Sequence, residues 1–424
     1  LAEARARTLE LVGRVSEEDL ARQHDSLMSP IIWDLGHIAH FEEVWLLEKL
    51  TGGAGDTEGL RGIYNPFETG RADRGTLPLP TLEECLEFMA AVRRSALDRL
   101  QTLDLSSTDP LLREGLVFHL VLQHEYQHNE TILQTLQLKQ GEPYPAPRAY
   151  TLPAGGAGER ALDADMVAFP GGIVDIGTDD RTPAYDNERP RHRVEIVPFR
   201  IDATPVTNRA YTEFIEAGGY RDESLWSEAG WAWLTESGAE APKYWEWVDG
   251  EWHARVMDAS GPVDPRRPVC HVCFHEAEAF ARFVGKRLPT EFEWEAAASW
   301  DPKAEAARSF PWGDEPLTPT LANVDALSFQ TAPVWSYETN VSPIGCYGMI
   351  GDVWEWTATD FHGYPGYETF PYPEYSEAFF GDGHKVLRGG SWASRSGAIR
   401  TSFRNWDLPI RRQIFSGLRC ASDD

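Results

Sequence analysis

The sequence predicts a helical bundle followed by an α+β domain, and three features of the chain indicate this class. The first third of the chain holds long segments with apolar residues at helical spacing and few internal glycines or prolines. A stretch dense in Pro and Gly follows at residues 141–163 and cannot continue a helix. Beyond it, short apolar runs alternate with Gly, Pro, Asn and Trp. We therefore place a bundle domain at 1–145, a linker at 146–163 and a second domain at 164–424.

Four helices are expected in the first domain, at about 2–15, 29–50, 81–103 and 109–139, where apolar residues recur with the helical period. Ser16, followed by three acidic residues, has the pattern of a helix start. An antiparallel bundle is the economical packing for these helices. In the second domain one amphipathic helix is expected at 275–284, and the remaining texture predicts a loop-rich α+β fold.

Composition excludes several classes of function. With 424 residues the chain exceeds the usual size of one hydrophobic core. Acidic residues outnumber basic ones 67 to 39, and a net charge of -28 repels nucleic acids and anionic lipid. The sequence has no long apolar span or signal-peptide core, so we expect a cytoplasmic protein without nucleic-acid or membrane partners, as a monomer or weak oligomer. Five scattered cysteines predict reduced thiols rather than a disulfide framework.

A histidine pattern predicts a metal site in the bundle. His124 and His128 are four residues apart on an expected helix, so their imidazoles lie about 40° apart around its axis and can share one ion. A third ligand should come from another helix, where His37 is the best candidate, with Gly36 relieving crowding beside it, and His40 is its competitor. Three neutral imidazoles leave open positions, which suits iron(II) binding a thiolate, a second substrate and dioxygen, although zinc also fits.

Two other interpretations of these histidines stay open. Residues 124–128 match the H-E-x-x-H pattern of zinc hydrolases, in which the Glu is the general base. The residues after His128 lack the further ligands of that class, and Glu130 lies about 200° from His128 around the helix. The histidines could also be ordinary core or surface residues of a bundle, which for any single histidine is the more common case.

Several motifs in the second domain carry a family resemblance. The strings TPVTN (204–208), GKRLPTEFEWE (285–295), GDVWEW (351–356) and RGGSW (388–392) occur in the order of the formylglycine-generating-enzyme domain. This resemblance, over about 166–421, implies a C-type-lectin-like α+β fold. The paired cysteines that follow the last motif in that family are absent from residues 392–399, so its copper-thiolate chemistry is not expected. A non-catalytic lectin-like binding module is a further alternative.

A bundle with H-x-x-x-H-x-E placed ahead of this domain resembles a DinB-like bundle, and the whole chain resembles the ergothioneine-biosynthesis sulfoxide synthases of the EgtB type. The resemblance implies iron(II) held by His37, His124 and His128. It also implies three small-molecule substrates: hercynine (N-alpha-trimethylhistidine), dioxygen, and gamma-glutamylcysteine or cysteine. The product would be a sulfoxide joined to imidazole C2. Ovothiol-type coupling of cysteine to histidine is a related alternative.

The resemblance also suggests substrate-binding residues near the end of the chain. Trp406 and Asn405 could receive a trimethylammonium group, which has no hydrogen to donate and is recognised by an aromatic face. Asp407 could hold the ammonium of the thiol substrate, with Arg411 orienting it. Without the family argument, this stretch would be an ordinary strand and turn.

Two further groups of candidates follow from the same resemblance. Arg71 and Arg74 resemble carboxylate-binding arginines of enzymes that use gamma-glutamylcysteine, although loop arginines are usually just solvated. Gln127 matches a glutamine near the imidazole substrate. For the proton-donating tyrosine, the tract 364–375 supplies candidates; we favour Tyr372, then Tyr375, although most tyrosines in such a tract are packing residues.

Overall fold

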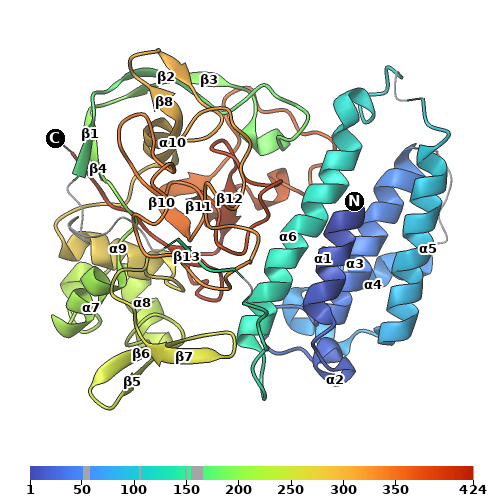
Figure 1. The fold of residues 1–424 in the computed structure, drawn as a ribbon, viewed down its shortest axis with the longest axis horizontal. Coiled ribbons are helices and arrows are strands. Elements are labelled where there is room, and N and C mark those ends of the chain that lie inside the picture. Colours follow the sequence, from blue (N-terminus) through green and yellow to red (C-terminus); the bar gives the residue numbers. More distant parts are fainter. Residues whose placement is uncertain (51–57, 105–106, 149, 154–165, 424) are drawn as a thin grey trace. The chain divides into compact units, whose positions relative to one another are not determined.

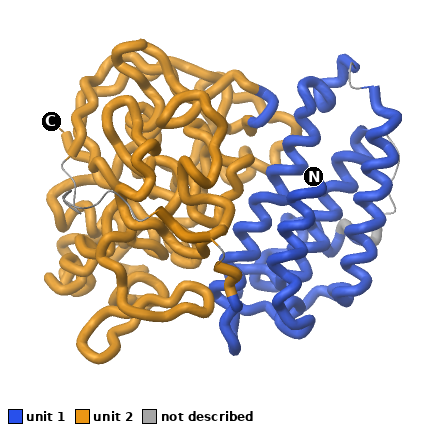
Figure 2. The backbone as a smooth tube through the Cα atoms, in the orientation of Figure 1, with its two compact units in different colours: residues 1–145, 181–183 blue, residues 146–180, 184–424 orange. Residues whose placement is uncertain are grey.

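The computed structural model describes residues 1–50, 58–104, 107–148, 150–153 and 166–423. The chain divides into two compact units, shown in Figure 2. Unit 1 comprises Leu1–Pro145 with Arg181–Pro183, and unit 2 comprises Ala146–Asp180 with Ala184–Asp424. Most of the expected linker at 146–163 lies outside the described residues, which omit 154–165.

Unit 1 is a helical bundle (Figure 1). Its helices are α1 (Ala2–Val12), α2 (Glu17–Ala21), α3 (Ile31–Glu43), α4 (Glu58–Tyr64), α5 (Leu82–Leu100) and α6 (Leu116–Leu138). The helix α3 continues as a π-helical segment, Val44–Lys49, and two short 3-10 helices cover Arg71–Thr76 and Arg113–Gly115. Contacts join α1 to α6, and α3 to both α5 and α6. The predicted bundle is confirmed, with α2 and α4 as additional short helices.

The helix ends depart from the expected ones for local reasons. The first helix ends at Val12, where the Gly13 amide donates to the Leu9 carbonyl. The Ser16 hydroxyl then accepts a hydrogen bond from the Asp19 amide and starts α2, as its pattern indicates. The fourth long helix begins only at Leu116, because Glu114 and Gly115 adopt positive φ angles of 56° and 74°. The expected start at 109 was therefore wrong.

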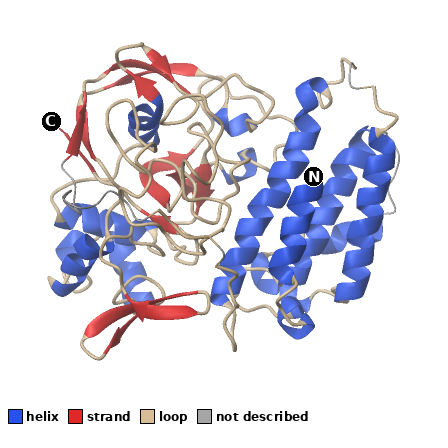
Figure 3. Ribbon diagram, in the orientation of Figure 1, coloured by secondary structure: helices blue, strands red, loops and turns tan. Residues whose placement is uncertain are grey.

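Unit 2 is a mixed α/β domain in which loops predominate over regular elements (Figure 3). Its largest sheet has the order β12-β11-β10-β13, with antiparallel pairs except for the parallel pair of β10 and β13. These four strands are β10 (Trp354–Phe361), β11 (Gly381–Arg388), β12 (Asn405–Asp407) and β13 (Ser416–Gly417). The strand β12 therefore lies at one edge of this sheet. The predicted fold class is confirmed.

The other strands form smaller sheets. A three-stranded sheet has the order β1-β4-β14, from β1 (Met166–Phe169), β4 (Phe199–Asp202) and β14 (Ala421–Asp423). Another contains β5 (Trp245–Val248), β6 (Glu251–Val256) and β7 (Ala259–Pro262). Two antiparallel pairs join β2 (Gly172–Ile176) to β3 (His192–Ile196) and β8 (Trp300–Asp301) to β9 (Ala306–Ala307).

Among its described residues, unit 2 contains four α-helices, of which the sequence predicted one. They are α7 (Asn208–Glu216), α8 (Glu228–Ser237), α9 (Phe274–Phe283) and α10 (Glu291–Ser299). The helix α9 matches the one expected at 275–284. The others have 9 residues in α7 and α10 and 10 residues in α8, and the sequence patterns did not predict them. Each begins after a hydroxyl residue, Thr207, Ser227 or Thr290, whose side chain accepts an amide hydrogen bond of the first turn.

Buried ion pairs organise the core of unit 2. Arg388, Arg404 and Arg419 are at most 1% exposed. Arg404 binds both oxygens of Glu291 at 2.8 Å, and Arg419 binds Glu355 at 2.9 and 3.0 Å. Such pairs need every donor satisfied, because removing one partner leaves an uncompensated charge in a medium of low dielectric constant.

Two further findings concern the cysteines and the length of the apolar helices. The five cysteines are all free thiols, as their scattered spacing predicts. Among the described residues, no helix is both long and apolar enough to cross a membrane.

Candidate metal centre

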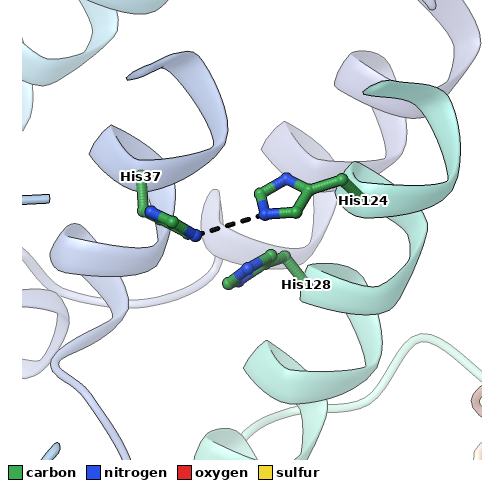
Figure 4. A group of neighbouring side chains, drawn as sticks. All are labelled: His37, His124 and His128. Carbon is green, nitrogen blue, oxygen red and sulfur yellow. Dashed lines mark hydrogen bonds between the residues drawn. The ribbon is translucent and has the colours of Figure 1, made fainter. Parts of the chain in front are cut away.

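The helices α3 and α6 bring three imidazole rings together in unit 1. His37 lies on α3, and His124 and His128 lie one turn apart on α6 (Figure 4). One ligand atom from each ring lies within 4.8 Å of the others, and the Nε2 atoms of His37 and His124 are 3.2 Å apart. Within the part of the chain that the structure describes, this is the one group of three or more His, Cys, Asp or Glu side chains that could share an ion.

Hydrogen bonds fix which nitrogen of two rings faces the cluster. The Nδ1 atom of His37 is 2.8 Å from the carbonyl oxygen of Tyr64, which can only accept, so Nδ1 carries the proton. The Nδ1 atom of His128 is 3.0 Å from Oδ1 of Asp34, a carboxylate that likewise accepts. In both rings the Nε2 lone pair is then left for a metal. Orienting partners of this kind are typical of histidine ligands.

Aromatic packing holds two of the rings in place. Trp33 stacks on His37 with centroids 4.7 Å apart and planes 16° from parallel. Phe41 stacks on His124 at 3.7 Å and 7°. The two imidazoles therefore have little freedom to rotate away from the cluster.

Gly36 allows a close approach beside the first ligand. A Cβ atom at position 36 would lie 2.1 Å from Cζ of the Tyr64 ring, so no side chain fits there. The glycine thus relieves crowding as the sequence indicates, and the neighbour that it accommodates is the residue whose carbonyl orients His37.

Burial sets the charge state of the cluster. It lowers the pKa of His37 and of His124 well below the usual value. Both rings are therefore neutral near neutral pH, the form in which imidazole binds a metal.

The carboxylate of the H-E-x-x-H string takes no part in this cluster. Glu125 accepts hydrogen bonds from Nε of Arg5 at 2.8 Å and from the Thr8 hydroxyl at 2.8 Å, and Arg93 lies 3.4 Å from its other oxygen. Arg5 and Arg93 also bind Glu42, which forms a buried ionic network within the bundle. A hydrolase would need this Glu beside the metal as general base, so the geometry disfavours that alternative.

The competing ligand and the nearby acid lie outside the cluster. His40 is buried on α3, with its ring centroid 6.2 Å from that of Tyr64, but it does not belong to the group that could share an ion. Glu130 is buried on α6 and is not a member either. The donor set is three imidazole nitrogens, which fits a divalent first-row metal such as iron(II) or zinc.

Replacing Asp34 by asparagine is expected to weaken metal binding by about 10- to 100-fold, the usual cost of losing a partner that orients a histidine ligand. Asparagine keeps the size of the side chain but loses the charge that favours a proton on Nδ1 of His128. Titration of the metal-free protein with a divalent metal measures the change. The control Asp25→Asn alters a carboxylate that accepts a hydrogen bond from the Leu27 amide and does not belong to the group that could share an ion. Unchanged affinity in Asp34→Asn would contradict the assigned role.

The other candidates in unit 1 differ in accessibility. Arg71 is exposed at the start of the 3-10 helix, whereas Arg74 is buried with its carbon Cζ 3.8 Å above the Trp33 ring. Arg74 donates to Oγ of Ser29 at 2.8 Å and to two backbone carbonyls at 3.2 Å, so much of its guanidinium holds the loop together. Gln127 is half-buried on α6 between the two histidines.

In unit 2 the candidates near the end of the chain share one edge strand. β12 carries Asn405, Trp406 and Asp407, which pair with β11. The Trp406 indole stacks on Phe361 at 4.2 Å and 6°, so its angle is fixed. Oδ1 of Asp407 accepts from Nε of Arg411 at 3.0 Å, so the structure brings these two together as the sequence interpretation requires.

The tyrosine candidates lie in the segment between β10 and β11. Tyr375 stacks on Tyr185 at 4.0 Å and meets the Trp406 ring edge-on at 5.3 Å. Tyr372 is half-buried, with its ring 6.4 Å from that of Tyr375, and burial raises its pKa well above the usual value. Tyr364 is buried beneath Arg404 and is part of the core.

Sequence reasoning missed the residues that orient the ligands. Asp34, which orients His128, is an acidic residue in the otherwise apolar start of α3, and an acid in such a stretch was an available signal. The carbonyl of Tyr64 and the ring of Phe361 carry no comparable signal, because each reaches its partner only through the fold.

Comparisons with known proteins cover the whole chain. Residues 1–132 match the family described as the DinB superfamily, and residues 155–424 match the sulfatase-modifying factor enzyme 1-like domain. A relative from Mycolicibacterium smegmatis named hercynine oxygenase is 45% identical over 100% of this chain and 97% of its own length. One of the same name from Mycobacterium tuberculosis is 43% identical over 100% and 97%. The formylglycine-generating enzyme of Streptomyces coelicolor is 34% identical over 66% of this chain and 95% of its own.

Proposed function

We propose that this chain, which belongs to the hercynine oxygenase family, uses iron(II) on His37, His124 and His128 to join the sulfur of gamma-glutamylcysteine to imidazole C2 of hercynine. The observation that carries the proposal is the cluster of three imidazoles, two of them buried and one half-buried, without a carboxylate. It occurs in a chain that is similar over its full length to relatives named hercynine oxygenase.

The overall reaction balances with one dioxygen for each pair of substrates. The imidazole loses the hydrogen on C2 and the thiol loses the hydrogen on sulfur. A C–S bond and an S–O bond form, and the second oxygen atom leaves as water with both hydrogens. Bound iron(II) would supply the redox chemistry with dioxygen and open positions for the reactants. The chain itself must orient two substrates and deliver protons.

Three residues are assigned to the binding of hercynine. The trimethylammonium group donates no hydrogen bond, so the indole of Trp406, held by Phe361, offers a fixed aromatic face for it. Asn405 on the same strand offers an amide oxygen to the cation. Gln127, next to His128 on α6, would reach the imidazole of the substrate through a water molecule.

Binding of the thiol is assigned to two charged groups. Asp407 would hold the ammonium of the thiol substrate. Arg411 would fix the Asp407 carboxylate through the hydrogen bond of 3.0 Å between them. Arg71 and Arg74 would bind the carboxylates of the thiol substrate, and Arg71 is the stronger candidate because it is exposed, whereas Arg74 is buried and donates to three acceptors of the protein. Gamma-glutamylcysteine has two carboxylates to offer such a pair, whereas cysteine has one.

One assay tests the proposal. The protein is loaded with iron(II) without oxygen and mixed with hercynine and one thiol; air is then admitted while oxygen consumption and products are followed by mass spectrometry. We expect the coupled sulfoxide, formed faster with gamma-glutamylcysteine than with cysteine. Absence of coupled product from hercynine with both thiols, and from histidine with cysteine, would falsify the proposal. Oxygen-independent peptide cleavage would instead support a hydrolase, and failure to bind any metal a non-catalytic module.

Replacing the proton-donating tyrosine by phenylalanine should divert the reaction to a sulfinic acid, in which both oxygen atoms end on the thiol sulfur and no water forms. General acid catalysis contributes about 10²- to 10⁴-fold, so the ratio of sulfoxide to sulfinic acid should decrease by a factor in that range. Tyr372→Phe is expected to show the shift, with Tyr375→Phe as the next candidate. Tyr367→Phe completes the panel, and Tyr364→Phe is the control from the core. A constant ratio in both Tyr372→Phe and Tyr375→Phe would remove them from this role.

A further inference from the structure

A short stretch of unit 2 holds the tyrosine segment and has no role in the proposal above. It begins at Tyr185 and continues through a 3-10 helix, Asp186–Glu188. The Asp186 carboxylate is only 2% exposed. It accepts from Oη of Tyr367 at 2.9 Å, from Oγ of Ser376 at 2.5 Å and from the Phe370 amide at 3.3 Å. One buried carboxylate thus binds the segment 367–376 near both ends.

The two neighbours of Asp186 hold the same segment. The ring of Tyr185 stacks on Tyr375 at 4.0 Å and 18°. The Asn187 side chain donates to Oγ of Ser376 at 3.0 Å. Three consecutive residues therefore contact the segment that contains the favoured candidates for the proton donor.

This stretch is itself anchored beside the substrate strand. Glu188 accepts from Nε of Arg400 at 2.8 Å and from the Ser402 hydroxyl at 2.8 Å. The backbone carbonyl of Asn187 accepts from Nη1 of Arg404 at 2.7 Å, and Arg404 immediately precedes β12. The same scaffold thus sets the place of the tyrosine segment and of the strand assigned to hercynine.

We infer that Asp186 is a positioning residue for proton delivery: by fixing the segment 367–376 at both ends, it holds the donating phenol in the orientation that proton transfer requires. This inference rests on the proposed function. Coupling releases water and needs protons on the departing oxygen, whereas formation of the sulfinic acid places both oxygens on sulfur and releases none. Misplacing the phenol therefore slows coupling more than the competing reaction.

The first measurement is structural and independent of activity. Hydrogen exchange is followed in the full chain for peptides that cover 367–376. Asp186→Ala and the milder Ser376→Ala should exchange there at least about tenfold faster than the unmodified protein, because local opening becomes less costly when the hydrogen bonds are removed. The matched control Asp179→Asn alters a nearby carboxylate that accepts the Arg191 amide and should leave the segment protected. Unchanged protection in both test variants would overturn the inference.

The second measurement is the product ratio under the iron(II) and oxygen assay. Asp186→Asn, which keeps the size of the side chain, and Ser376→Ala should lower the ratio of sulfoxide to sulfinic acid by about 10- to 100-fold, the effect of displacing a catalytic group by about 1 Å. Asp179→Asn should keep the original ratio. Faster exchange with an unchanged ratio would overturn the positioning role. If the unmodified protein forms no coupled product, the proposed function fails, and the exchange data still decide whether Asp186 fixes the segment.

Discussion

His124→Ala is expected to lower metal affinity by at least about 10³-fold and to abolish formation of the coupled product. The cluster offers three nitrogens, and the loss of one leaves a pair that competes poorly with water for a divalent ion. The ring also fills the space against Phe41, so the variant should lose some stability as well. Metal content after dialysis and product yield measure the effect.

His40→Ala is the matched control, because His40 is also buried on a bundle helix but lies outside the cluster. We expect it to retain metal with nearly unchanged affinity once folding has been verified by circular dichroism. Loss of metal in His40→Ala together with retention in His124→Ala would exchange the assignments of the two histidines. Retention in both would place the ion elsewhere.

Glu291→Gln is expected to destabilise unit 2 by about 3–5 kcal/mol, the usual cost of breaking a buried ion pair by removing one partner. Glu291 is 1% exposed and binds Arg404 through both oxygens, with Arg388 3.4 Å away. The amide would leave two buried guanidinium groups short of negative charge. Urea denaturation followed by tryptophan fluorescence measures the change.

Glu278→Gln provides the comparison on the surface. Its partner Arg282 lies one turn away on α9 at 2.9 Å, and both side chains are partly exposed, so its loss should cost less than about 1 kcal/mol. Similar costs for Glu291→Gln and Glu278→Gln would show that the buried pair contributes no more than a solvated one.

The sequence predicted those features that depend on local periodicity. The helical period linked His124 to His128, and the structure places them one turn apart on α6 beside His37. The fold class followed from the change of texture after residue 140 and is confirmed. Short helices escaped prediction: α10 is buried on nearly all sides, so it has no polar face to alternate with an apolar one.

Features that depend on long-range contacts could not be read from the sequence. The parallel pairing of β10 with β13 joins residues about sixty positions apart, and no local pattern announces it. The hydrogen bond from Ser376 to Asp186 joins residues 190 positions apart. The choice among the tyrosines has the same origin, because a phenol is assigned to catalysis by its surroundings rather than by its neighbours along the chain.

Because residue 36 is a glycine without a side chain, the local packing of the backbone determines the tautomer of the ligand His37. A methyl group there would push away the aromatic residue that closes over α3, and with it the carbonyl that retains the hydrogen of the first imidazole. That hydrogen could then migrate to the opposite nitrogen and block the lone pair. Gly36 thus determines which tautomer of His37 is present when a cation binds.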